Sequence, residues 1–238
     1  MGSSHAELFR KRWFPDAVIM TCVRWYTRYS LSLRDVRDLI AERDAVIDHS
    51  TIWRWLQRYA PVFRKRLQCK VRCTGACWRV DETYVRVAGE WTYLYRAVDA
   101  DGQTIDFLLS RQRDAEAARH FFRQAIADVR HLAPKEIVTD GNPTYPAIIK
   151  ELKRAHIIAS RCRFRCSRAL NNRVEQDHRA IKRRIQAKQW FRSWNGAVNA
   201  IAGYEAMHML RKGQVEWVAS GSVVAHIAFF ESLLLTAE

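Results

Sequence analysis

Apolar residues in the first quarter of the chain recur at the three-to-four-residue spacing of α-helices. This spacing predicts helices at about 15–29, 33–40 and 51–60, with Pro61 marking the end of the third. Serine or threonine residues stand before the second and third helices, where they can act as N-caps. Three short helices with tight links are typical of a helix-turn-helix, although any small three-helix bundle shows the same pattern.

Beyond residue 77 the pattern changes to strand-like runs at Trp78–Val87, Glu90–Val98 and Thr104–Ser110, separated by glycine-containing turns. A meander of three strands followed by alternating helices and strands predicts an α/β fold, a mixed sheet with flanking helices. The later predicted elements are a helix at 115–129, a strand at 136–139, a helix at 145–153, a short strand near 157–159, and a helical stretch over most of 174–211 with a break near 194–196.

These patterns divide the chain into a small all-α helix-turn-helix domain at residues 1–68 and a larger α/β domain at 69–238 that includes the C-terminal helices. The role of the tail after Gln214 stays unassigned. The apolar content of 48% is enough for a packed core. No apolar run approaches the roughly 20 residues that span a bilayer, and the N-terminus lacks a secretory signal, so we expect a cytoplasmic, nucleoid-associated protein with no membrane partner.

Net charge narrows the class of partner. The 238 residues include 40 Lys and Arg against 25 Asp and Glu, a formal charge of +15. Eleven basic residues but only two acidic ones fall between Arg161 and Arg192. A solvated surface would mix the signs more evenly, so the pattern favours binding to the phosphates of nucleic acid.

Three carboxylates stand at positions that suit a metal site. Asp81 lies mid-strand, Asp140 follows the strand at 136–139, and Glu175 opens the last helical stretch. Each alone has an ordinary explanation: a polar strand residue, a turn former and a complement to the helix dipole. Together, a strand centre, a strand end and a helix start can converge on one rim of a sheet.

Clustered carboxylates repel one another unless cations neutralise them, and Mg²⁺ prefers such oxygen ligands. Mn²⁺ is expected to substitute for it. Two such ions about 3.5–4 Å apart would activate the attacking oxygen and stabilise the leaving oxygen of a displacement at phosphorus. The arrangement therefore predicts phosphodiester chemistry.

Basic residues accompany the last of these acids. At helical spacing Glu175, His178, Arg179 and Lys182 share one face, with Lys182 seven positions after Glu175. We predict phosphate contacts for this group, although His178 could equally be a simple helix-surface histidine. Asp177 points elsewhere on the helix and is not expected to bind metal.

Several longer segments resemble one known family. The segments are His49–Trp55, Trp78–Tyr84, Thr139-Asp140 ahead of Tyr145, Asn171–Arg179 with Lys182-Arg183-Arg184, and Glu205–Gln214. They resemble the DDE transposases of bacterial and archaeal insertion sequences, specifically insertion sequence family six, from about residue 15 to residue 214.

The resemblance implies a ribonuclease-H-like catalytic core behind the helix-turn-helix, with Asp81, Asp140 and Glu175 as catalytic metal ligands and Lys182 as a DNA contact near the scissile phosphate. It also implies a replicative reaction, in which 3′-hydroxyls are freed at terminal inverted repeats and joined to target DNA to give cointegrates. One departure stands beside the metals: the family usually has Lys-Ala-Pro after the second aspartate, whereas this chain has Gly141-Asn142-Pro143.

Further DNA contacts are expected on both domains. In the third helix, Trp53 is as consistent with the core as with the DNA groove. Alternating arginines at 161–168 are expected to follow the DNA backbone. The complete set of predicted DNA contacts is Ser50, Thr51, Arg54, Gln57, Arg58, Arg163, Arg165, His178, Arg179, Lys182 and Arg183.

Six cysteines raise the question of zinc. Cys69, Cys73 and Cys77 recur every four residues, as do Cys162 and Cys166. That spacing fits successive helical turns, whereas structural zinc sites usually use closer Cys-x₂-Cys pairs. We expect ordinary reduced thiols rather than a zinc site.

The predicted function is that of a Mg²⁺-dependent DNA transposase, acting on inverted repeats and target DNA as a homodimer or larger assembly that holds two element ends together. The alternatives are a helix-turn-helix regulator that binds DNA without cutting it, a nuclease that cleaves without joining, and a decayed transposase that has lost turnover.

Overall fold

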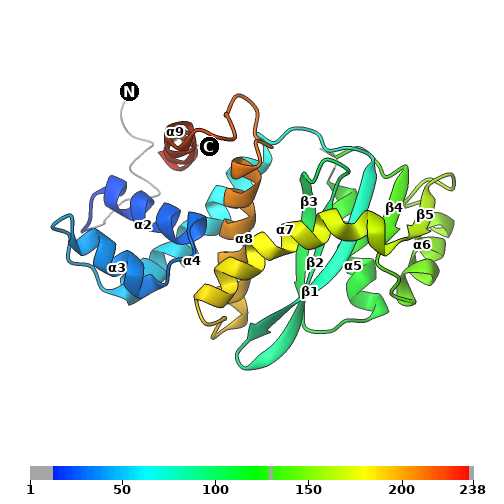
Figure 1. Ribbon diagram of the computed structural model, residues 1–238, viewed down its shortest axis with the longest axis horizontal. Helices are drawn as coiled ribbons and strands as arrows, with labels where there is room; N and C mark the ends of the chain where they lie inside the picture. The colour runs from blue at the N-terminus through cyan, green and yellow to red at the C-terminus, as the bar shows by residue number, and fades with distance from the viewer. Residues whose placement is uncertain (1–12, 129–130, 236–238) are drawn as a thin grey trace. The chain divides into compact units, whose positions relative to one another are not determined.

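The computed structural model describes residues 13–128 and 131–235 (Figure 1). The chain forms two compact units. One unit combines the chain up to Val71 with the chain from Arg183 onward, and the other is Arg72–Lys182. No helix in the described ranges is both long enough and apolar enough to cross a membrane.

The first unit is helical. It begins with α2 (Asp16–Arg28), α3 (Leu33–Ala41) and α4 (His49–Gln68), the three helices that the apolar spacing predicts. Ser32 caps α3 through a reciprocal capping box with Asp35. The cap of α4 differs from the prediction, because Asp48 takes that role in place of Ser50 or Thr51 and accepts from the Ser50 backbone N–H at 2.8 Å.

The predicted end of α4 at Pro61 is wrong, because the helix continues through Pro61 to Gln68. Proline has no N–H to bond the carbonyl four residues earlier, which here belongs to Gln57. Asn199 of α8 (Trp194–Arg211) fills the gap, since its Nδ2 donates to the Gln57 carbonyl at 3.5 Å and to the Gln57 Oε1 at 3.0 Å. A partner distant in sequence therefore satisfies the carbonyl that an internal proline leaves without its helical donor.

The C-terminal helices belong with the N-terminal ones. Thirteen of the 18 residues of α8 are buried, and the helix packs along α4. The tail left unassigned by the sequence forms α9 (Val223–Leu235), whose Phe230 ring lies 4.6 Å from that of Phe63. The predicted assignment of every residue after 68 to the catalytic domain thus differs from the structure, because the apolar surface of α4 is covered by α8 and α9.

The second unit contains a five-stranded sheet in the order β3-β2-β1-β4-β5. The first three strands are antiparallel, and β4 and β5 run parallel to β1. This confirms the predicted mixed sheet. The strands are β1 (Cys77–Val87), β2 (Glu90–Val98), β3 (Thr104–Ser110), β4 (Glu136–Thr139) and β5 (Arg163–Cys166).

The strand predicted near 157–159 is wrong. Ile158 is buried, but in the bend that follows α6, and the fifth strand is Arg163–Cys166. The misassignment arises because β5 lies at the edge of the sheet with Arg163 and Arg165 exposed, so it lacks the apolar alternation that marks a half-buried strand.

Helices cover both faces of this sheet. The core on one face joins Trp78, Val80 and Tyr95 of the sheet to the apolar sides of α5 (Ala115–Ala127) and α6 (Thr144–Arg154). Residue 129, the predicted end of α5, lies outside the described residues.

The other face carries α7 (Arg168–Ala187), within which the two units divide (Figure 1). The chain leaves helical geometry after α7, with Gln189 and Trp190 at positive φ, and Ser193 then caps α8. The predicted break near 194–196 therefore lies a few residues earlier, at 188–193.

Helices α2, α4 and α8 approach one another closely at Gly203, which leaves no room there for a larger side chain. A Cβ there would lie 2.8 Å from the Ala60 Cβ and 2.8 Å from the Thr27 Cγ2. We predict that Gly203→Ala lowers the free energy of unfolding by about 1–3 kcal/mol, since α2 or α4 must shift. Gly221→Ala, with nothing within 4 Å of its added Cβ, should stay within about 0.5 kcal/mol of wild type in the same urea titration. Equal stability of both variants would contradict this close packing.

Candidate metal centre

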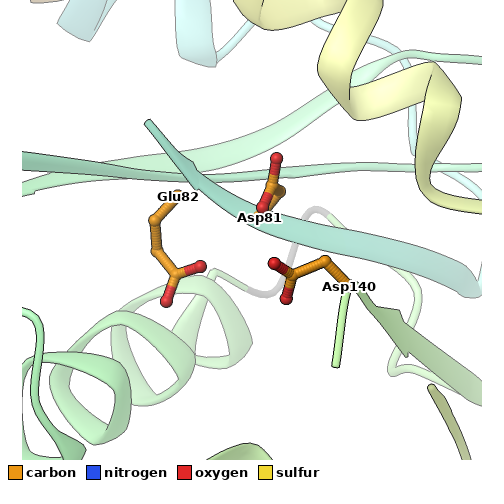
Figure 2. Close-up of side chains that lie close together, drawn as sticks. All are labelled: Asp81, Glu82 and Asp140. Atoms are coloured by element: carbon orange, nitrogen blue, oxygen red, sulfur yellow. The ribbon is translucent and has the colours of Figure 1, made fainter. Parts of the chain in front are cut away.

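Carboxylate oxygens of Asp81, Glu82 and Asp140 lie within 4.8 Å of one another. Figure 2 shows the three side chains turned toward a common space beside β1. They form the one cluster of three or more potential metal-ligating side chains found in the described parts of the chain. The cluster joins two of the predicted ligands, Asp81 and Asp140, to a residue that the sequence analysis did not single out.

The end of β4 explains how these side chains meet. The pairing of β1 with β4 runs from Cys77 opposite Glu136 to Val80 opposite Thr139, and β4 ends there. Asp140 is the next residue, so it lies beside β1 where that strand loses its neighbour. Successive residues of a strand point to opposite faces. Because the edge of β1 is open here, carboxylates from both faces can approach Asp140.

Contacts around Glu82 hold it in this position. Its Oε1 accepts from Asn142 Nδ2 at 3.1 Å and lies 3.6 Å from Arg113 Nε. Its Oε2 is buried, and the Tyr145 hydroxyl is a neighbouring donor to this carboxylate. Burial raises the pKa of Glu82, a hydrogen bond with Tyr145 and the charge of Arg113 oppose the rise, and the charges of Asp81 and Asp140 add to it.

Strand alternation is the reason that sequence analysis missed Glu82. It places adjacent residues on opposite faces, which argues against Asp81 and Glu82 sharing a site. Asn142 belongs to the segment that departs from the family pattern. Here its side chain ties the turn after Asp140 to Glu82, and its backbone N–H donates to Asp140 Oδ1 at 3.2 Å.

Two consecutive residues dock α7 on the opposite face of the sheet. The Asp177 Oδ2 lies 2.5 Å from the Arg96 Nη2, and the His178 Nε2 lies 3.4 Å from the Asp81 Oδ2. Asp81 and Arg96 are themselves cross-strand partners in β1 and β2. Asp177 thus pairs with Arg96 and is not a member of the carboxylate cluster.

His178 lies in a different environment from the one we predicted. Its ring is buried, with 4% of the residue exposed, so it differs from the surface DNA contact expected of it. Burial lowers the pKa of His178, while its hydrogen bond to Asp81 raises it. The reason is that the helix face carrying His178 packs directly on the sheet.

Glu175 lies on the same helix, three residues before His178, and its side chain is exposed. It is absent from the three-carboxylate cluster. Since α7 starts just after the edge strand β5 and reaches β1 and β2 at Asp177 and His178, Glu175 occupies the part of the helix that precedes this docking point.

Some of the other predicted DNA contacts are exposed to solvent, whereas others contact residues within the protein. Gln57 is only partly exposed and bonds Asn199 and the Gly196 carbonyl. Trp53 is partly buried and would meet an added Cβ at Gly196 at 2.8 Å, which indicates a packing role. Thr51 and Lys182 are partly exposed, and the exposed members are Ser50, Arg54, Arg58, Arg163, Arg165, Arg179 and Arg183.

The cysteines do not lie on successive helical turns. Cys69 caps the end of α4, Cys73 lies in the connection, and Cys77 begins β1. All six are free thiols, with Cys22 and Cys162 buried.

Comparison with known proteins identifies the family. The family model described as a DDE domain matches residues 75–214. A transposase for insertion sequence-like element IS431mec from Staphylococcus aureus strain Mu50 is 38% identical over 204 residues, 86% of this chain and 88% of the relative. A transposase for insertion sequence element IS257 in transposon Tn4003, also from Staphylococcus aureus, is 37% identical over the same shares.

Among solved structures, the chain is similar to the magnesium complex of the HTLV-2 integrase catalytic core domain. The dimeric form aligns with a TM-score of 0.43 and 17% identity, covering 64% of this chain and 100% of that chain. The trimeric form aligns with a TM-score of 0.38 and 20% identity, covering 46% and 68%.

The family match includes Asp81, Asp140 and Glu175, and the two relatives extend the similarity over most of the chain. The mixed sheet with helices on both faces agrees with the expected ribonuclease-H-like core. An acidic cluster lies at the end of β4. The chain belongs to the DDE transposases of insertion sequence family six.

Proposed function

We propose that this transposase binds the terminal inverted repeats of its insertion sequence, frees their 3′ ends and joins those ends to target DNA by replicative transposition. The observation that carries the proposal is the meeting of Asp81 and Asp140 where β4 ends, within a chain of the DDE family. The substrate is double-stranded DNA, for which the charge of +15 is suited.

Glu175 is proposed as the third catalytic carboxylate. His178 contacts Asp81, and a residue three positions earlier lies on the same face of a helix, about 5–6 Å away between Cβ atoms. The exposed Glu175 side chain is free of the sheet contacts that bury His178. A glutamate at this point can therefore turn toward the site where Asp140 lies.

The donor set fits a hard divalent cation. Its atoms are carboxylate oxygens of Asp81 and Asp140, with Glu175 as the proposed third ligand and Glu82 beside them. Mg²⁺ is the proposed ion, Mn²⁺ is expected to replace it, and zinc, which favours sulfur and nitrogen ligands, is disfavoured. When bound, the cations supply Lewis-acid activation of the attacking oxygen and stabilisation of the leaving oxygen.

Protein groups near this site would hold the DNA. Lys182 lies one turn beyond His178 on α7, and Arg179 and Arg183 are exposed on the same helix. Their charges would bind phosphates on either side of the reacting one. Exposed Arg163 and Arg165 extend positive charge along the edge strand β5, where Glu136 is 3.9 and 3.6 Å from them.

The helical unit is proposed to recognise the inverted repeats. Ser50, Arg54 and Arg58 are exposed along one side of α4, the second helix of the helix-turn-helix pair formed with α3. Two element ends must be held together, so we propose a homodimer or larger assembly in the cytoplasm, on the nucleoid.

The primary test is cointegrate formation in cells between a plasmid carrying the gene with its native flanks and a recipient plasmid. We expect cointegrates with wild type and none above background with Asp140→Asn, because the substitution removes a carboxylate charge from the cluster. Equal yields from the two proteins would reject the DDE site. No cointegrates from expressed wild type would favour a DNA-binding regulator or a decayed enzyme.

A second prediction separates Glu175 from Glu82. Glu175→Gln should abolish joining and weaken Mn²⁺ binding in calorimetry, because it removes a ligand. Glu82→Gln should weaken metal binding by about 10- to 100-fold, as expected of a supporting contact. Glu116→Gln, an exposed acid on α5, is the matched control and should leave both measurements unchanged. Full joining by Glu175→Gln, with none by Glu82→Gln, would make Glu82 the third ligand.

A further inference from the structure

The hairpin formed by β1 and β2 carries an aromatic and cationic face. Its cross-strand partners are Glu82 with Tyr95, Tyr84 with Tyr93, and Arg86 with Trp91. Directly opposed residues share a face of the sheet, and so do residues two positions apart. These six side chains therefore form one row of pairs, which we call the hairpin ladder.

The members of the hairpin ladder contact one another. The Tyr84 ring centroid lies 5.3 Å from that of Tyr93 and 6.3 Å from that of Trp91 in an edge-to-face arrangement. The Arg86 guanidinium lies over the Trp91 ring, 5.8 Å from its centroid. The three rings thus contact one another, and the Arg86 guanidinium places positive charge at the end of the row farthest from Glu82.

Exposure increases along the ladder away from the metal centre. Tyr95 is fully buried and Tyr93 is partly exposed, whereas Tyr84 is 47% and Trp91 55% exposed. The opposite face of the same hairpin is buried at Thr83, Val85, Val87, Thr92 and Leu94. The hairpin therefore buries one face already, and the outward positions of such a strand are ordinarily polar.

The ladder is continuous with the carboxylate cluster. Glu82 belongs to both, and Arg113 lies 3.6 Å from it. From Glu82 to Arg86 the strand advances about 13 Å, since each residue adds about 3.3 Å. A DNA strand that leaves the metal centre along β1 would meet Arg113 first, then the exposed tyrosine and tryptophan, and then Arg86.

We propose that the hairpin ladder stacks against unpaired bases of the DNA strand held at the metal centre. This inference rests on the proposed function, since it names the state of the DNA bound at that site. Exposed aromatic rings bind the faces of bases, which are hidden within an intact duplex. The two arginines attract the accompanying phosphates. The partner is therefore a DNA end whose terminal base pairs have opened.

The test compares two DNA probes with the full-length protein in the absence of divalent metal. One probe is a paired duplex, and the other has the same sequence but a frayed end with about four unpaired nucleotides, a length within the range of stacking sites. We expect wild type to bind the frayed probe more tightly. Trp91→Ala should reduce this preference by about tenfold, the order of one lost base–aromatic stack. Trp91→Phe, which keeps a ring, should largely restore it.

The ratio of the two affinities is the readout, because a folding defect would lower both together. Trp217→Ala is the matched control, since Trp217 is 96% exposed and lies outside the hairpin. An unchanged ratio in Trp91→Ala, an equal loss for both probes, or no preference in wild type would each overturn the proposal. The cointegrate assay tests the joining reaction separately. If the protein forms no cointegrates but still shows the Trp91-dependent preference for the frayed probe, the proposed function is rejected and the stacking proposal stands.

Discussion

Electrostatic repulsion among the carboxylates at the open edge of β1 is the interaction that the surrounding contacts of the second unit must balance. Three carboxylates with oxygens within 4.8 Å repel one another, and the repulsion must be balanced by neighbouring groups or cations. Arg113 and Asn142 contact Glu82, His178 contacts Asp81, and the Asn142 backbone N–H donates to Asp140, so neighbouring polar groups contact all three. The negative charge that remains on the three carboxylates favours binding of a divalent cation.

The helix that carries Glu175 is fixed by the same group of residues. Asp177 and His178 contact Arg96 and Asp81, which face each other across β1 and β2. Removing one partner of a buried ion pair such as Arg96–Asp177 costs several kcal/mol, about 3–5 by analogy with other proteins. Such a pair is specific in direction, so it sets the rotation of α7 about its axis. That rotation decides which way Glu175 can turn.

In the helical unit, contacts with α8 compensate for residues that do not suit a regular helix. Pro61 should interrupt α4, but Asn199 supplies the donor that proline lacks, and Gly203 lets the helices approach closely. Both features join the N-terminal helices to α8, which lies far along the sequence. This explains why the compact helical unit includes the C-terminal part of the chain.

The sequence alone determined the class of fold and the family. It also identified Asp81 and Asp140, the two aspartates that meet in the carboxylate cluster. Local periodicity and turn residues are sufficient to place β1 to β4, because each strand carries its own apolar pattern. Long motifs around Glu175 and Glu205 are specific enough to identify relatives. Net charge likewise depends only on composition, and it indicated a polyanionic partner without any knowledge of structure.

Only the tertiary structure decided the features that depend on distant partners. It placed Glu82 beside Asp81, because β4 ends where it does and opens the edge of β1. It buried His178, continued α4 past Pro61 and replaced the expected strand at 157–159 with the exposed edge strand β5. In each case a contact with residues far away in sequence outweighs the local preference, and such contacts cannot be read from periodicity.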